Sequence, residues 1–313
     1  MKIAAKCIDI HPSAKIEDSV EIHCESFSLG ENSYIGENVK IKCRNFSAGK
    51  HLYMTSGVEV GRGGCTNPNS TVTIGDYVGI FENTIINPNS PITIGDYVGI
   101  GCDVQLWTHG AWLNVLQGFP SSFGPITIGD NVWLPARSIV LPNVKIGNNT
   151  VIAINSVINK SLPSGCLAGG NPAKVIRENR YPKKIPSHEQ IKILKDLVYQ
   201  WRESIEARGY EGIVGFAAVR DVPFTSSNPY HFSLRIEFFN HSDEERDCIQ
   251  FYEFKIDCSK QPYSIEYHYT PSVIYPEDVL FFSDLVDFLR RNGVKLYNSP
   301  FPFKSLTPTY MQI

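Results

Sequence analysis

An aliphatic residue recurs at every sixth position through a long stretch of this chain. The longest unbroken series consists of Ile128, Leu134, Val140, Ile146, Ile152 and Ile158. A period of six fits neither an α-helix, with its 3.6 residues per turn, nor a strand with strictly alternating faces. It fits a chain that turns a corner after each short, straight segment and points one aliphatic side chain inward from each segment.

The same period extends toward the N-terminus, where a longer repeat is superimposed on it. The segments 67–80 and 87–100 are identical at 12 of 14 positions, with an offset of 20 residues. Pairs of glycine with Asp, Glu or Asn recur between the aliphatic positions, and we expect them to supply the unusual dihedral angles of the corners. Three segments close a coil of 18 residues, and stacked coils bury a continuous apolar column. The sequence therefore predicts a β-solenoid whose parallel strands are hydrogen-bonded from coil to coil.

This pattern resembles the hexapeptide-repeat acyltransferases, in particular the sugar and polysaccharide O-acetyltransferases. The similarity covers roughly residues 8–180 and is densest over 126–178, which contain the closing segment GGNPAKVIR (169–177). The resemblance implies a left-handed parallel β-helix, because the period alone gives no hand and the general crossover rule favours a right-handed one. It also implies acetyl-CoA as acyl donor, no metal, and a homotrimer with sites between subunits.

A long excursion interrupts the ladder after Leu106, and the ladder resumes at Ile126. The excursion spans residues 107–125, which include His109 and four large aromatic side chains. Loops of this length are usually functional or disordered, and this one is too aromatic for a disordered linker. In the resembled family a histidine in such a loop is the catalytic base, and His109 in the segment WTHG occupies the matching place.

The chemistry of acetyl transfer suits that assignment. A hydroxyl group that attacks a thioester must lose its proton, and an imidazole accepts protons near neutral pH. The tetrahedral oxyanion needs a donor, for which a backbone N–H at a coil edge is the best candidate. Transfer would then be direct, in a ternary complex. The alternative is that His109 only decorates an aromatic loop.

Polar residues in the two near-identical repeats could orient the imidazole or hold the acceptor. Glu82, Asn83 and Asp103 are the first candidates, because Asn83 and Asp103 occupy equivalent repeat positions. Asn87 and Trp107 are weaker candidates for the same roles. The alternative for the polar residues is that they are ordinary corner residues.

The resemblance places coenzyme A along the coils, in a groove between neighbouring subunits. Small residues on the later coils would allow close approach, and basic residues near the end of the repeats would meet the phosphates. These candidate cofactor-binding residues are Ala136, Ala153, Ser156, Lys160, Lys174 and Arg177. The alternative for the basic residues is a solvated surface.

The repeat region and the remainder of the chain form separate predicted domains. We assign residues 1–180 to the β-helix, 181–186 to a linker and 187–313 to an α+β domain of unknown role. That domain is expected to contain helices from Ser187 to about Gly209 and from Pro276 to about Asn292. Strands are expected near 212–220, 230–240, 248–257, 263–270 and 294–297.

Composition narrows the function classes. The chain has 313 residues, 42% hydrophobic and 19% charged, with a net charge of -3. This hydrophobic content excludes a disordered chain. The chain also lacks the excess of basic residues that is typical of a nucleic-acid-binding protein. No apolar run reaches the roughly 18 residues of a membrane span, and no signal peptide is expected. The eight cysteines contain no CxxC pair, which favours reduced thiols in a cytoplasmic protein.

The favoured function is O-acetylation of a sugar or surface-glycan precursor, as in polysaccharide biosynthesis. The first alternative is N-acetylation of an amino sugar attached to a nucleotide. The second is a non-catalytic β-helix scaffold that binds partners through the C-terminal domain. A third alternative, a bound zinc ion, would use His11, His23 and His51 of the early coils at a subunit interface.

Overall fold

The computed structural model describes residues 1–209, 215–222, 231–239, 248–257, 264–271 and 276–294. The chain divides into two compact units, Met1–Lys183 and Lys184–Ile313. The border between them falls within the segment 181–186. No helix in the described ranges is long and apolar enough to cross a membrane.

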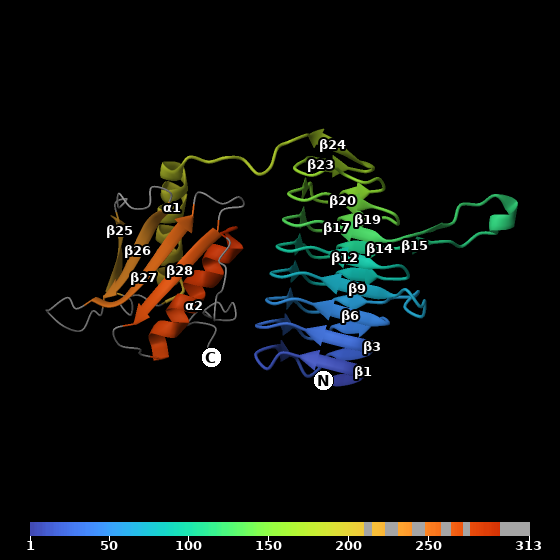
Figure 1. Ribbon diagram of the computed structural model, residues 1–313, viewed down its shortest axis with the longest axis horizontal. Coiled ribbons are helices and arrows are strands. Elements are labelled where there is room, and N and C mark those ends of the chain that lie inside the picture. The colour runs from blue at the N-terminus through green and yellow to red at the C-terminus, as the bar shows by residue number, and fades with distance from the viewer. Residues whose placement is uncertain (210–214, 223–230, 240–247, 258–263, 272–275, 295–313) are drawn as a thin grey trace. The chain divides into compact units, whose positions relative to one another are not determined.

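The first unit is a β-solenoid, as predicted, in which short parallel strands form three faces (Figure 1). A nine-stranded sheet forms the first face, and its last strand is antiparallel to the one before it. Its strands are β2 (Lys15–Ile16), β4 (Tyr34–Ile35), β7 (Tyr53–Met54), β10 (Gly79–Ile80), β13 (Gly99–Ile100), β18 (Trp133–Leu134), β21 (Val151–Ile152), β23 (Leu167–Gly170) and β24 (Ala173–Arg177).

The second and third faces belong to one 13-stranded sheet, because β3 runs around a corner and joins them. The second face contains the start of β3 (Glu21–Leu29), then β5 (Lys40–Lys42), β8 (Glu59–Val60), β11 (Ile85–Asn87), β14 (Gln105–Trp107), β19 (Ile139–Val140) and β22 (Val157–Ile158). The third face contains the end of β3, then β6 (Asn45–Ala48), β9 (Thr71–Ile74), β12 (Ile92–Ile94), β17 (Ile126–Ile128) and β20 (Lys145–Ile146). Strand β1 (Lys2–Ile10) pairs with β3 at the N-terminal end.

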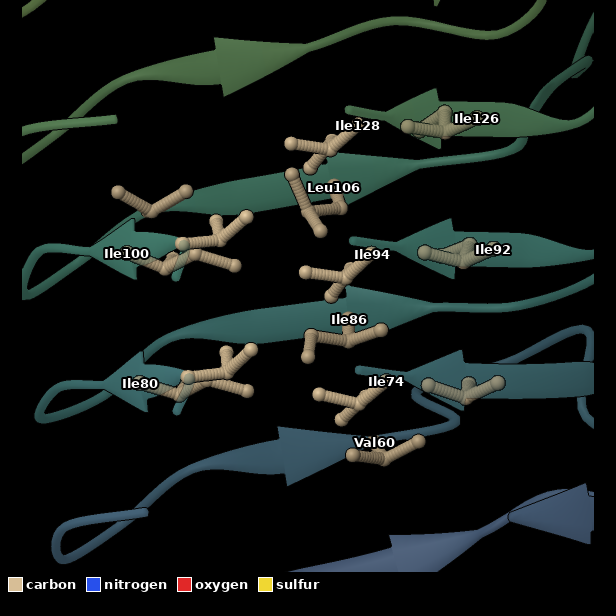
Figure 2. Packing of buried hydrophobic residues seen from close by; sticks show 14 of the residues in the cluster. Val60, Ile74, Ile80, Ile86, Ile92, Ile94, Ile100, Leu106, Ile126 and Ile128 are labelled. Carbon is tan, nitrogen blue, oxygen red and sulfur yellow. The ribbon is translucent and has the colours of Figure 1, made fainter. Parts of the chain in front are cut away.

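The predicted aliphatic ladder is the core of this unit. Most short strands of the first two faces point one aliphatic side chain inward, whereas β9, β12 and β17 of the third face point two inward. The inward side chains of successive coils stack in columns (Figure 2). Ile80, Ile86 and Ile100 have no exposed surface, and Ile94 is 1% exposed. The six-residue period therefore arises because one of these inward positions recurs on every face of every coil.

Corners join the faces of each coil. The glycines of these corners do not have the role that was expected from the sequence, which was to adopt the unusual dihedral angles. In the Gly-Asp pairs the left-handed backbone falls one residue after the aspartate, at Tyr77 and Tyr97, where φ is 57°. Gly75 instead allows close contact between coils, since a Cβ there would lie 2.2 Å from Asp96 Oδ1. That carboxylate oxygen accepts a hydrogen bond of 2.8 Å from the Asp76 backbone N–H of the preceding coil. The expectation that the pairs themselves supply the unusual dihedral angles was wrong.

Chain order defines three columns of corners. The first corner lies between the first and second faces, the second corner between the second and third, and the third corner leads into the next coil. Both long excursions of the solenoid leave at the second corner, at residues 61–70 and 108–125. The later one is an arm that projects away from the coils, with β15 (His109–Gly110) and β16 (Ser122–Phe123) antiparallel at its base and a 3₁₀ turn (Val115–Gln117) near its tip (Figure 1).

The second unit is α+β, as predicted. A four-stranded antiparallel sheet has the order β25 (Gly215–Val222), β26 (His231–Phe239), β27 (Cys248–Asp257) and β28 (Ser264–Pro271). Helices α1 (Ser187–Ala207) and α2 (Pro276–Arg291) contact each other through Trp201, whose Nε1 donates to buried Asp284 at 2.9 Å. Arg208 donates to both oxygens of the same carboxylate, at 2.8 and 2.6 Å. The strand predicted at 294–297 lies outside the described residues apart from Val294.

Candidate active site

His109 lies at the base of the arm, between two aromatic rings. Its imidazole stacks on Phe123 with centroids 5.8 Å apart and an interplanar angle of 22°. Trp107 meets the same imidazole edge-on at 6.5 Å. Both neighbours are fixed by backbone pairing, because His109 and Phe123 are opposite each other in the β15–β16 ladder and Trp107 ends β14. The imidazole is therefore half-buried in one orientation.

The residue before His109 is hydrogen-bonded to the preceding coil. Thr108 is fully buried, and its hydroxyl donates to the Asn87 carbonyl oxygen at 2.6 Å. The same hydroxyl accepts a hydrogen bond of 3.0 Å from the Ser90 backbone N–H. From the coil above, Asn143 Nδ2 donates to the Phe123 carbonyl oxygen at 2.9 Å. The base of the arm is thus anchored on both sides.

Asn87 is the polar side chain that the fold brings to this place. It pairs in register with Trp107 and has no exposed surface. Its Nδ2 donates to the carbonyl oxygens of Arg62 and Gly63. Within the described part of the chain, however, Asn87 Oδ1 and His109 Nδ1 are both buried without a hydrogen-bond partner. Buried polar atoms are rarely left unpaired, so these two atoms set this part of the chain apart from the regular coils.

The excursion 61–70 is a part of the site that sequence reasoning missed. Asn89 Nδ2 donates to the Gly64 carbonyl oxygen at 3.4 Å. A Cβ on Gly64 would lie 3.0 Å from His109 Cε1, so this backbone covers one edge of the imidazole. The spacing of inward residues along the sequence could have revealed this excursion. Met54 and Ile80 are inward residues of successive coils, and more residues separate them than a regular coil contains.

The structure places Glu82, Asn83 and Asp103 together, but at the first corner and not beside His109. Strand β14 lies between Asp103 and the arm, and Asp103 faces Arg137 of the next coil at 3.9 Å. Asn83 lies against Gly57 of the preceding coil. In this chain these residues are corner residues, and within one copy they do not contact the imidazole.

The residues predicted to bind the cofactor fall into three separate places. Ala136, Ala153 and Ser156 line the first corner, where the Ser156 hydroxyl donates to the Ala153 carbonyl oxygen at 2.6 Å. Lys160 is exposed at the second corner, two coils beyond the arm. Lys174 and Arg177 are exposed on β24. One copy of the chain therefore does not gather these residues around His109.

The structure does not bring the three early histidines together. His11 Nδ1 lies 2.8 Å from the Ser13 hydroxyl, whereas His51 stacks on Tyr77 at the third corner. His23 lies on β3 beside a cavity at the second corner. Among the residues that the structure describes, no group of three His, Cys, Asp or Glu could hold a metal ion.

A comparison with protein families identifies the repeats. Residues 125–160 match the family described as bacterial transferase hexapeptide (six repeats). The matched region contains the last part of the aliphatic ladder and begins directly after the arm. The resemblance to hexapeptide-repeat acyltransferases is thereby confirmed for this part of the chain.

Proteins with similar sequences are named acetyltransferases. A candidate acetyltransferase of Saccharomyces cerevisiae is 40% identical over 112 residues, which are 35% of this chain and 57% of the yeast protein. The galactoside O-acetyltransferase of Escherichia coli is 46% identical over 54 residues, 17% of this chain and 27% of that enzyme. The chain thus spans little more than half of the first relative and about a quarter of the second.

Part of the chain also aligns with solved structures. A hexapeptide-repeat-containing acetyltransferase of Vibrio cholerae, solved with acetyl coenzyme A, is 27% identical and aligns with a TM-score of 0.27. That alignment covers 46% of this chain and 69% of the Vibrio protein.

Proposed function

We propose that the first unit transfers an acetyl group from acetyl-CoA to a hydroxyl group of a sugar or surface-glycan precursor, with His109 as the general base. The observation that carries this proposal is the imidazole held between Trp107 and Phe123, with its buried Nδ1 left without a hydrogen-bond partner. The acetyltransferase names of the relatives and the hexapeptide match support the reaction class.

The proposed step is direct acyl transfer. The imidazole removes the proton of the acceptor hydroxyl as its oxygen attacks the thioester carbonyl carbon. The tetrahedral oxyanion then collapses, the carbon–sulfur bond breaks, and the leaving thiolate takes the proton from the imidazolium. No acyl-enzyme forms, so donor and acceptor must be bound together.

Asn87 and Trp107 are the residues that we propose for acceptor binding. Asn87 has no exposed surface, so its unpaired Oδ1 can accept a hydrogen bond from a second sugar hydroxyl only when the arm or the excursion 61–70 moves aside. The Trp107 indole offers an apolar face next to the imidazole, and aromatic faces suit the C–H side of a sugar ring. Glu82, Asn83 and Asp103 could contribute to the same site only from another copy of the chain.

A homotrimer would reconcile the scattered cofactor residues. Ala136, Ala153 and Ser156 line the first corner, whereas His109 and Lys160 lie at the second corner. A groove between two copies can pair the first corner of one with the second corner of the other. Lys174 and Arg177 would then supply positive charge toward the phosphates of coenzyme A.

The test is calorimetric titration of the full chain with acetyl-CoA, followed by turnover measured as free thiol release. A methyl galactoside and galactosamine serve as matched hydroxyl and amino acceptors, which separates O-acetylation from N-acetylation. His109→Ala should bind about one equivalent per chain, as the parent does, and lose turnover by about 10²–10⁴-fold. His11→Ala, which removes an exposed histidine far from the arm along the chain, should keep full turnover.

Two results would contradict the proposal. If neither protein binds acetyl-CoA at high micromolar concentration, a non-catalytic scaffold becomes the better explanation. If both bind and His109→Ala turns over at the parental rate, His109 is not the base.

A further inference from the structure

Two cysteines stack at the second corner, at the N-terminal end of the solenoid. Strands β3 and β5 are paired in register, with His23 opposite Lys42, so Cys24 and Cys43 occupy the next positions on successive coils. Their Sγ atoms lie 3.9 Å apart, and both thiols are free. Neighbouring parallel strands are about 4.8 Å apart, which lies within the range of Cα separations that a disulfide spans.

The proton of this pair belongs on Cys43. Its Sγ also lies 3.4 Å from the Asn45 carbonyl oxygen, which can only accept a hydrogen bond. The single Cys43 proton is shared between this oxygen and Cys24 Sγ, and the hydrogen bond to Cys24 lowers the pKa of Cys24. The same contact together with burial raises the pKa of Cys43. Cys24 is therefore the sulfur with more thiolate character, and the thiolate is the nucleophile in cysteine chemistry.

Small molecules can reach the pair. Cys24 is half-buried and is reached directly from the solvent. Cys43 is only 4% exposed and lines a cavity of about 390 Å³, which Cys24 does not line. The basic side chains of Lys42 and Arg44 line the same cavity, as does Cys65 from the excursion 61–70. An oxidant the size of hydrogen peroxide fits this space.

We propose that Cys24 and Cys43 form a dithiol site that reacts with hydroperoxides and closes to a disulfide between two successive coils. The Cys24 thiolate attacks the peroxide, the O–O bond breaks, and after uptake of one proton a sulfenic acid and water result. The Cys43 sulfur then attacks that sulfur and gives up its proton to the departing hydroxyl group, so that the S–O bond breaks, the S–S bond forms and a second water leaves. Two thiols and one hydrogen peroxide thus give one disulfide and two waters, independently of any acyl transfer.

The experiment treats the full chain with hydrogen peroxide, blocks the remaining thiols and maps the tryptic peptides by mass spectrometry. Cleavage after Lys15, Lys40, Lys42 and Arg44 should yield peptide 16–40 joined to the dipeptide 43–44, and dithiothreitol should separate them. Free Cys24 should disappear roughly tenfold faster than exposed Cys7.

Matched variants separate this site from general oxidation. Cys24→Ser and Cys43→Ser should each abolish the joined peptide, whereas Cys7→Ser and Cys102→Ser should leave it unchanged. A bond from Cys43 to Cys65, overoxidation of Cys24 without a cross-link, or equal rates for Cys24 and Cys7 would each overturn the proposal. The time course on the parent chain gives the answer even where a variant does not fold.

Discussion

His109 owes its orientation to residues from several coils. Thr108 anchors the backbone to Asn87 one coil below, and Asn143 holds the Phe123 backbone from one coil above. Aromatic contacts and the backbone at Gly64 enclose the ring, and no carboxylate among the described residues is bonded to it. The imidazole is therefore positioned by packing, so a small steric change should disturb it.

Gly64→Ala is the substitution that tests this positioning. The new methyl group would lie 3.0 Å from His109 Cε1 and 2.9 Å from Asn89 Cβ, so the ring or the excursion must shift. We expect turnover to fall by about tenfold or more, since misplacement of a catalytic group by about 1 Å can cost 10²-fold. Acetyl-CoA binding, measured by calorimetry, should remain.

The adjacent glycine provides the control for Gly64→Ala. Gly63 also has a positive φ, of 75°, but a Cβ there would meet no atom within 4 Å. Gly63→Ala therefore introduces similar backbone strain, of order 1 kcal/mol, without touching the imidazole. Equal losses of turnover in the two variants would show that strain in the excursion matters and contact with His109 does not.

At the scale of the single coil, stability depends on the inward residue of each face. Ile100 has no exposed surface and packs among the inward residues of neighbouring coils (Figure 2). Ile100→Ala should lower the free energy of unfolding by about 2–5 kcal/mol, because it removes buried methyl groups and leaves a cavity. Urea denaturation followed by circular dichroism measures the change.

An outward isoleucine on a later coil gives the comparison. Ile154 is 65% exposed at the first corner, and Ile154→Ala should change the free energy of unfolding by no more than about 0.5 kcal/mol. If the two variants lose similar stability, the six-residue ladder is not the main source of the cohesion between coils.

The coil is also the element that the sequence predicts best. An inward aliphatic residue at the same position of every face is a local requirement, so the series from Ile128 to Ile158 reveals the solenoid without any knowledge of contacts. The candidate site depends on which excursions meet, and that is not local. Asn83 and Asp103 became candidates because they share a repeat position. Asn87 lies at the end of the next face, where residues 61–70 fold back onto it. His109 was predicted because its loop interrupts the ladder and because the resembled family has a catalytic histidine in such a loop.

At the scale of the whole molecule, the arm is the feature that a single copy leaves unexplained. It exposes 95% of Trp112 and 93% of Leu116, with Leu113 and Val115 also more than half exposed. Large exposed apolar groups usually mark surfaces that another molecule covers. In the proposed homotrimer the arm of one copy would rest on its neighbour, close to the site that both copies form.

Replacement of both apolar residues near the arm tip tests this arrangement. By sedimentation, we expect the parent protein to have a mass of three times 35.1 kDa, the mass of one chain. The double variant Trp112→Ser with Leu116→Ser should shift the population toward single chains. Trp133→Ser removes a tryptophan that is 56% exposed on the first face, away from the arm, and should leave the sedimentation unchanged. A parent that sediments as a single chain would refute the trimer. If the arm variant remains trimeric, other surfaces hold the copies together, and covering the bound acceptor becomes the proposed role of the arm.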